Sequence, residues 1–363
     1  MNSPAHSQPT PKSLVFVIGA GASSEVKLPL GSELKNKITK LLDFRSNDFE
    51  RRDHNYGDNL IFNAFQLLAT QSAGRQGDIH PYIHAAKQIH DAMPLAISID
   101  NFIDAHRGNK PIEIVGKLAI VRSILDAEAK SALAIDSSNI YNRLNFGKIE
   151  STWFNYFFQL LTENCQADSL PKRLGQVAII CFNYDRCIEH HLFNALQNYY
   201  KMSEENAATT LANLEIYHPY GTVGQLPLMG KNESIAYGAQ TTADKLIQLT
   251  ARIRTFTEGS NIEESDILKI RNVLNNPDRI VFLGFAFHRQ NLELLFPRQP
   301  NEFRKKKNCL VFSTGVGISS PDAAALQDEL FSLACIDQKA VNIAHEKSCA
   351  QLFEYFRRSL SFR

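Results

Sequence analysis

The chain has 363 residues, of which 44% are hydrophobic and 21% charged, values typical of a soluble globular protein. Its formal net charge of +1 provides no electrostatic reason to expect nucleic acid or an anionic membrane as the main partner. The six cysteines contain no Cys-x-x-Cys pair, which argues against a zinc ribbon and, at this length, against a disulfide framework. We therefore expect a cytoplasmic protein without bound zinc.

The N-terminal part of the chain combines a polar start with an apolar strand and a glycine turn. Residues 1–12 are rich in Pro and Ser and lack the apolar core of a signal peptide, so we expect a short disordered leader. The apolar run Leu14–Ile18 predicts a buried strand. It leads into Gly19, Ala20, Gly21, Ala22 and Ser23, a tight turn that a phosphate can approach, above all if a helix follows.

The middle and end of the chain alternate between predicted helices and strands. No convincing strand occurs between about residues 43 and 149, which predicts a helical insertion. Further strands are expected at residues 176–182, 213–218, 279–285 and 309–314, and most are continuously apolar, as parallel strands covered on both faces are. Helices are expected at residues 112–130, 150–164, 186–200 and 322–333, with Ser32 as the N-cap of an earlier helix.

These elements predict an α/β fold, a Rossmann-like parallel sheet with helices on both faces. Residues 13–330 form the main domain in this interpretation, and residues 331–363 form two C-terminal helices. Residues 221–245 are rich in Gly, Ser, Thr and Gln and predict a long loop or lid. The basic run at residues 304–307 is expected to be a solvated loop, and the aromatic run at residues 153–158 to be core or a subunit interface.

Polar residues follow the predicted strands where open α/β sheets bind ligands. Asn183 and Asp185 follow the second strand and can hydrogen-bond a sugar, although both could simply cap the next helix. His218 ends the third strand, where it is well placed for proton transfer near pH 7 or is a structural histidine. Gly284 ends the fourth strand and either admits a ligand or marks a bulge.

The glycine turn does not fit a hydride-transferring dehydrogenase. Ser24 stands where such enzymes have their third glycine, and the expected second strand with an acidic end is missing.

Taken together, the elements resemble the sirtuin superfamily, specifically its SIR2-like branch found in bacterial defence systems. The Gly19–Ser23 turn followed by Leu28-Pro29 resembles the opening nucleotide loop of that family. Asn183-Tyr184-Asp185 is similar to its Asn-x-Asp motif, and His218 with Gly221 to its histidine-glycine element. The resemblance covers about residues 14–320.

Three further segments of the chain extend the resemblance to the family. Gly284 with Phe285, and residues 313–319, are similar to the loops that hold the adenosine half of NAD in the family. The segment around Asp100 is similar to one seen before the second strand of SIR2-like proteins.

The departures from deacylating sirtuins indicate a different reaction. The four paired zinc cysteines are missing, and so is the arginine that follows the proline of the cofactor loop. Pro219 and Tyr220 stretch the histidine element. These differences favour cleavage of NAD without a protein substrate.

The resemblance implies an NAD hydrolase that cleaves the nicotinamide–ribose bond. The pyrophosphate would bind the Gly19–Ser23 turn, Asn183 would orient the ribose and the attacking water, and His218 would be the general base. Asp185 would fix the loop, and Asp100 would reach the nicotinamide side. Hydrolysis and cyclisation use the same motifs, so both products stay open.

The family also implies a cellular role, namely depletion of NAD in abortive anti-phage defence. We expect control by homo-oligomerisation or by a partner such as a HerA-type ATPase or a short Argonaute. Two other classes of function stay open: an NAD-dependent protein deacylase or ADP-ribosyltransferase, and a non-catalytic scaffold that senses NAD or ADP-ribose.

Overall fold

The computed structural model describes residues 12–44, 57–73, 77–136, 143–229, 234–259, 266–297 and 308–362. The expected leader, except for Lys12, and the basic run at residues 304–307 lie outside this part of the chain.

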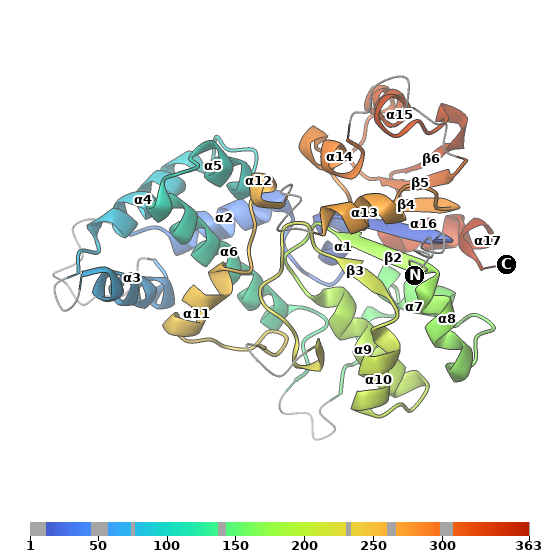
Figure 1. Ribbon diagram of the computed structural model, residues 1–363, viewed down its shortest axis with the longest axis horizontal. Coiled ribbons are helices and arrows are strands. Elements are labelled where there is room, and N and C mark those ends of the chain that lie inside the picture. Colours follow the sequence, from blue (N-terminus) through green and yellow to red (C-terminus); the bar gives the residue numbers. More distant parts are fainter. Residues whose placement is uncertain are drawn as a thin grey trace, which may run out of the picture.

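A parallel sheet of six strands in the order β3-β2-β1-β4-β5-β6 forms the centre of the fold (Figure 1). The order reverses between β1 and β4, as in Rossmann-like sheets. The α/β prediction is thus confirmed. The strands are β1 (Leu14–Ile18), β2 (Val177–Cys181), β3 (Glu215–Tyr217), β4 (Arg279–Leu283), β5 (Leu310–Gly315) and β6 (Val341–His345).

Alternate side chains of the buried strands enter two separate cores, one on each face of the sheet. On one face, the Phe16 ring packs at 4.9 Å from Phe157 and at 6.0 Å from Phe353. On the other face, Val15 and Val17 enter a second apolar cluster. Burial on both faces explains why β1 and β2 are continuously apolar. The first core is covered by α7 (Trp153–Thr162), α8 (Leu170–Gly175), α9 (Cys187–Tyr199), α10 (Glu204–Leu211), α16 (Cys349–Tyr355) and α17 (Arg357–Leu360).

Helices gather into a lobe beside the sheet (Figure 1). Between β1 and β2 the described residues form helices and no strand, in keeping with the expected insertion. The lobe consists of α2 (Gly31–Leu41), α3 (Asn59–Ala73), α4 (His80–Ala92), α5 (Ile99–Ala105), α6 (Lys110–Lys130), α11 (Ala243–Thr250) and α12 (Phe256–Gly259). The last two come from the segment after β3, so the predicted loop region ends in a helix that packs on the insertion. The remaining helices are α1 (Ala20–Ser24), α13 (Ile267–Val273), α14 (Arg289–Leu295) and α15 (Ser320–Ala334).

The prediction of Ser32 as an N-cap is wrong. Helix α2 begins at Gly31, and its N-cap is Leu30, whose backbone N–H donates to the Glu33 carboxylate at 2.8 Å. The acidic side chain at the third helical position accepts from the backbone N–H of the N-cap residue, as in one half of a capping box, and Ser32 lies inside the first turn.

The prediction that residues 331–363 form only helices is also wrong. This segment contains β6, which pairs with β5 along its whole length and extends the sheet. β6 lies at the sheet edge and is only partly buried, so it lacks the continuous apolar run that marked the inner strands. The C-terminal segment therefore belongs to the same sheet as the rest of the chain.

The aromatic run at residues 153–158 is core. Trp153, Phe154, Phe157 and Phe158 are buried, and the Trp153 indole N–H donates to the Ala22 carbonyl oxygen at 2.8 Å. The Trp153 indole therefore anchors α7 to the loop after β1.

None of the helices in the described ranges combines the length and hydropathy that crossing a bilayer requires.

Candidate active site at the strand-order reversal

A cavity of about 410 Å³ lies at the carboxyl ends of β1, β2 and β4. Its walls come from the loops after these strands, from the loop after β3 and from α5 of the insertion. It therefore lies at the reversal of strand order between β1 and β4, the place where open α/β sheets bind ligands. Its volume falls within the range of roughly 300–1,000 Å³ that small-molecule sites have.

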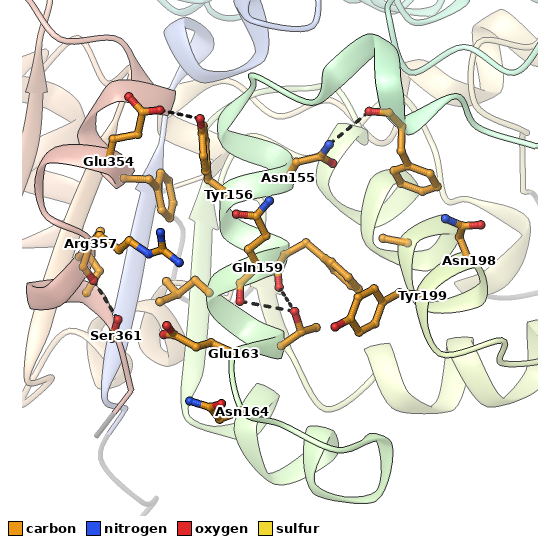
Figure 2. Close-up of a pocket in the computed structure, with 17 residues that line it drawn as sticks. Asn155, Tyr156, Gln159, Glu163, Asn164, Asn198, Tyr199, Glu354, Arg357 and Ser361 are labelled. Carbon is orange, nitrogen blue, oxygen red and sulfur yellow. Dashed lines mark hydrogen bonds between the residues drawn. The ribbon is translucent and has the colours of Figure 1, made fainter.

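A larger hollow of about 820 Å³ lies between α7, α9 and the α16–α17 segment (Figure 2). Figure 2 shows Tyr156, Gln159, Tyr199 and Arg357 around it. None of the residues predicted for the site lines this hollow, and it is bounded by helices rather than by strand ends. We therefore take the cavity at the strand ends as the candidate site.

The three glycines of the predicted site lock two loops together. The Gly21 N–H donates to the Gly284 carbonyl oxygen at 3.0 Å. A Cβ on Gly21 would lie 2.8 Å from Gly284 Cα, and one on Gly19 would lie 2.5 Å from Gly284 O. Gly284 itself has a φ of +54°, and a Cβ there would lie 2.1 Å from the Ala22 nitrogen. The primary reason for these glycines is thus contact between two loops.

This interlock changes how the turn can meet a phosphate. Gly19 and Ala20 line the cavity, whereas Gly21, Ala22 and Ser23 do not. Helix α1 has only five residues, and the Gly21 N–H is already used by Gly284. A ligand in the cavity therefore contacts only Gly19 and Ala20 of this turn, and not the backbone N–H groups of the whole Gly19–Ser23 segment.

Asn183 and Asp185 both line the cavity and both stabilise the loops around it. The Asn183 amide donates to the Gly19 carbonyl oxygen at 3.0 Å and to Ser23 Oγ at 2.9 Å, which leaves its Oδ1 to accept from a ligand. Asp185 accepts from the Cys187 N–H at 3.2 Å and from the Ser23 hydroxyl. The N-cap of α9 is Arg186, and Asp185, one residue earlier, accepts from the first N–H of the helix at Cys187.

His218 lies behind Asn183 and does not line the cavity. Its Nδ1 lies 3.1 Å from the Asn183 carbonyl oxygen, and its Nε2 lies 2.8 Å from Glu189 Oε1. Both neighbours are acceptors, so both ring nitrogens donate and the ring is an imidazolium. Burial alone would lower the pKa of His218, but the adjacent Glu189 charge raises it well above its usual value. As a cation, this ring has no lone pair with which to accept a proton.

The group in the cavity that does have acid–base character is Asp100. The Tyr184 hydroxyl, from the loop after β2, donates to Asp100 Oδ1 on α5. Burial raises the pKa of Asp100 to about 7, which brings its titration into the neutral range. A second tyrosine, Tyr220, also lines the cavity, and its hydroxyl donates to Asn291.

Tyr184, Tyr220 and Asn291 were not singled out from the sequence. Tyr184 is the central residue of the Asn-x-Asp motif, and Tyr220 directly precedes Gly221 in the stretched histidine element. Their places inside these two motifs are the sequence feature that could have identified the tyrosines. The stretched histidine element brings Tyr220, and not His218, to the cavity wall.

The loop after β4 forms the mouth of the cavity and is strained. Phe285 is buried in the wall, while His288 and Arg289 are exposed at the start of α14. Besides Gly284, the non-glycine residue Phe287 has a positive φ of +53° and packs on Phe282 and Phe285. Such conformations are costly and concentrate at functional sites.

No protein-family model, curated protein or solved structure matches the chain. Within the described residues, no group of three or more His, Cys, Asp and Glu side chains is arranged to hold a metal ion.

Proposed function

We propose that this protein is an NAD⁺ glycohydrolase that cleaves the nicotinamide–ribose bond in the cavity at the strand ends. The observation that carries the proposal is the distribution of charge along that cavity. Its inner wall is aromatic and acidic, with Tyr184, Tyr220 and Asp100, whereas its mouth has the exposed Arg289 and His288. NAD⁺ has the matching polarity, because its pyridinium ring is a cation and its diphosphate is an anion.

The cavity has side chains suited to both the pyridinium ring and the diphosphate of NAD⁺. Aromatic faces and a carboxylate attract a cationic ring. Arg289 is about two-thirds exposed and pairs with Glu293 of its own helix, so it can turn toward a phosphate at the mouth. Asn183, on the loop after β2, also lines the cavity, and its Oδ1 can accept from a ribose hydroxyl.

The resemblance to SIR2-like proteins supports the same reaction and extends the proposal to the cell. In that extension the enzyme depletes NAD during anti-phage defence and is restrained by self-assembly, a HerA-type ATPase or a short Argonaute. Expression of the active chain is then expected to lower cellular NAD, whereas an inactive variant leaves it unchanged.

The direct test is incubation of the purified chain with NAD⁺ and separation of nicotinamide, ADP-ribose and cyclic products by chromatography. We expect release of nicotinamide by the parent and a loss of roughly 10²-fold in Asn183→Ala, because the ribose and the attacking water would be misplaced. Asn198→Ala is the matched control, since Asn198 lines the other hollow and should leave turnover unchanged.

Calorimetry with NAD⁺ separates the alternatives. Binding without turnover would favour a sensing scaffold, and nicotinamide release that requires an acylated peptide would favour a deacylase. A chain that neither binds nor cleaves NAD⁺ would contradict the proposal.

A further inference from the structure

Hydrolysis of NAD⁺ needs a proton acceptor inside the cavity. As the C1′–N bond breaks, its electron pair leaves with nicotinamide. The oxygen of water then forms the new bond to C1′ and must lose one proton, which ends on a base. The products are nicotinamide and ADP-ribose, and the base later releases its proton to solvent.

Three of the titratable groups near the site are poor candidates for this base. Both nitrogens of His218 donate to fixed acceptors, and its ring lies outside the cavity. The Asp185 carboxylate already accepts from Cys187 and Ser23. His288 is exposed at the mouth, where a base gains nothing over bulk water.

Asp100 differs from these groups in its position and in its hydrogen bonds. It is half-buried in the cavity wall, on a helix whose start is capped by the Ser98 hydroxyl, which accepts from the Asn101 N–H at 3.1 Å. The carboxylate accepts from the Tyr184 hydroxyl and from the Asp100 backbone N–H, and it lines the cavity, where it can receive a proton from water. Tyr184 lies next to Asn183 in the chain, so one loop orients both the ribose and the carboxylate.

We propose that Asp100, held by Tyr184, accepts the proton of the attacking water, and that His218 is a positioning residue that fixes the Asn183 backbone. This inference rests on the proposed function of the cavity. The chain of contacts runs from Glu189 through His218 to the Asn183 carbonyl, and from the Asn183 amide to Gly19.

The charged surroundings of Asp100 bear on the pH dependence. Tyr184, Asp185, Tyr220, His288 and Arg289 share the cavity with it. Asp104 lies one turn further along α5, and the helices packed against α5 bring Glu113, Lys117 and Glu258, of which the last two form an ion pair at 2.9 Å. Since burial raises the pKa of Asp100 to about 7, kcat is expected to rise through neutral pH as this carboxylate ionises.

The test is the pH profile of nicotinamide release for the full chain and its variants, with NAD⁺ binding measured by calorimetry on the same samples. In Asp100→Asn we expect kcat to fall by roughly 10²–10⁴-fold and the rise near pH 7 to disappear, with NAD⁺ affinity nearly unchanged. In Tyr184→Phe the rise should move to higher pH, because the ionised carboxylate loses a donor. Asp104→Asn, on the same helix but outside the cavity, should keep the parent's kcat and its rise near pH 7, with at most a small shift of that rise from the lost charge.

His218→Ala distinguishes positioning from proton transfer. If His218 only positions Asn183, this variant loses activity but keeps the rise near pH 7. The inference is overturned if Asp100→Asn retains the parent rate and profile, or if the rise disappears in His218→Ala instead. If Asp100→Asn does not fold, an unshifted profile in Tyr184→Phe overturns it. A parent that releases no nicotinamide removes the proposed function and this inference together, whereas the preceding outcomes leave the function intact.

Discussion

At the scale of single residues, two glycines with similar backbone conformations have very different surroundings. Gly284 has a φ of +54° and Gly317 a φ of +76°, so both lie in the left-handed region. A Cβ on Gly317 would meet nothing within 4 Å, whereas one on Gly284 would lie 2.1 Å from the Ala22 nitrogen. Only Gly284 therefore combines conformational strain with close contact between the loops after β1 and β4.

We expect Gly317→Ala to lower the free energy of unfolding by about 1–2 kcal/mol, the cost of a left-handed side chain. Gly284→Ala should lower it by more than about 3 kcal/mol, because the added methyl group also collides with backbone. Urea unfolding of both variants gives the comparison. If both variants lost the same free energy of unfolding, the close contact of Gly284 with the loop after β1 would add nothing to the cost of the left-handed conformation.

At the scale of elements, His218 and Glu189 join the end of β3 to helix α9. Both side chains are nearly inaccessible, with 11% and 5% exposed. Burial alone would raise the pKa of Glu189, but the His218 charge brings it below its usual value. The raised pKa of His218 stabilises the fold below about pH 6.5 and is lost as pH rises through its value in the folded protein. The lowered pKa of Glu189 stabilises above about pH 4.5.

The pair should therefore contribute fully between about pH 4.5 and 6.5. We expect Glu189→Gln to lower the free energy of unfolding by about 1–3 kcal/mol at pH 6, and by less at an alkaline pH high enough for the parent His218 to lose its proton as well. Urea unfolding at the two pH values measures this difference. Glu163→Gln, at an exposed position, serves as the control and should change little at either pH. A pH-independent loss in Glu189→Gln would contradict the charge on His218.

At the scale of the whole molecule, an ion pair joins the helical lobe to the sheet. Glu128 on α6 and Arg186 before α9 are 0% and 2% exposed. The Arg186 guanidinium binds both carboxylate oxygens of Glu128 and donates to the Ile235 carbonyl oxygen at 2.6 Å. Glu128 also accepts from the Gly238 N–H at 3.1 Å, so the same pair holds the segment after β3.

Arg186→Met should lower the free energy of unfolding by about 3–5 kcal/mol, because it leaves the Glu128 carboxylate buried and unpaired. The control is Lys130→Met at the end of α6, whose partner Asp126 lies 2.7 Å away in a solvent-exposed pair, and which should cost at most about 1 kcal/mol. Chemical denaturation measures both. The double change Glu128→Leu with Arg186→Met should recover much of the loss, and failure to do so would show that the contacts to Ile235 and Gly238 matter more than the charge.

Much of the architecture could be predicted from the sequence, because inner parallel strands are buried on both faces and must be continuously apolar. That requirement marks β1, β2, β4 and β5 in the chain, and the helical periods between them imply a parallel sheet. Edge strand β6 is only partly buried, so it mixes polar and apolar residues, and a search for continuous apolar runs does not find it. The N-cap of α2 was wrongly predicted for a local reason, since the apolar residue Leu30 is the N-cap and Ser32 lies inside the first turn.

The amino-acid sequence by itself determined the sheet, its direction and the edge at which polar residues collect, since these follow from periodicity and from the connection of strands by helices. Only the tertiary structure decided which of those residues share a cavity. Side chains at neighbouring positions of a loop point in different directions, so one can line the cavity while the next does not. In addition, contacts such as that of Tyr184 with Asp100 join positions 84 residues apart. The local pattern of residues does not predict such contacts. The tertiary structure places Tyr220 in the cavity wall and His218 behind it as a buried cation.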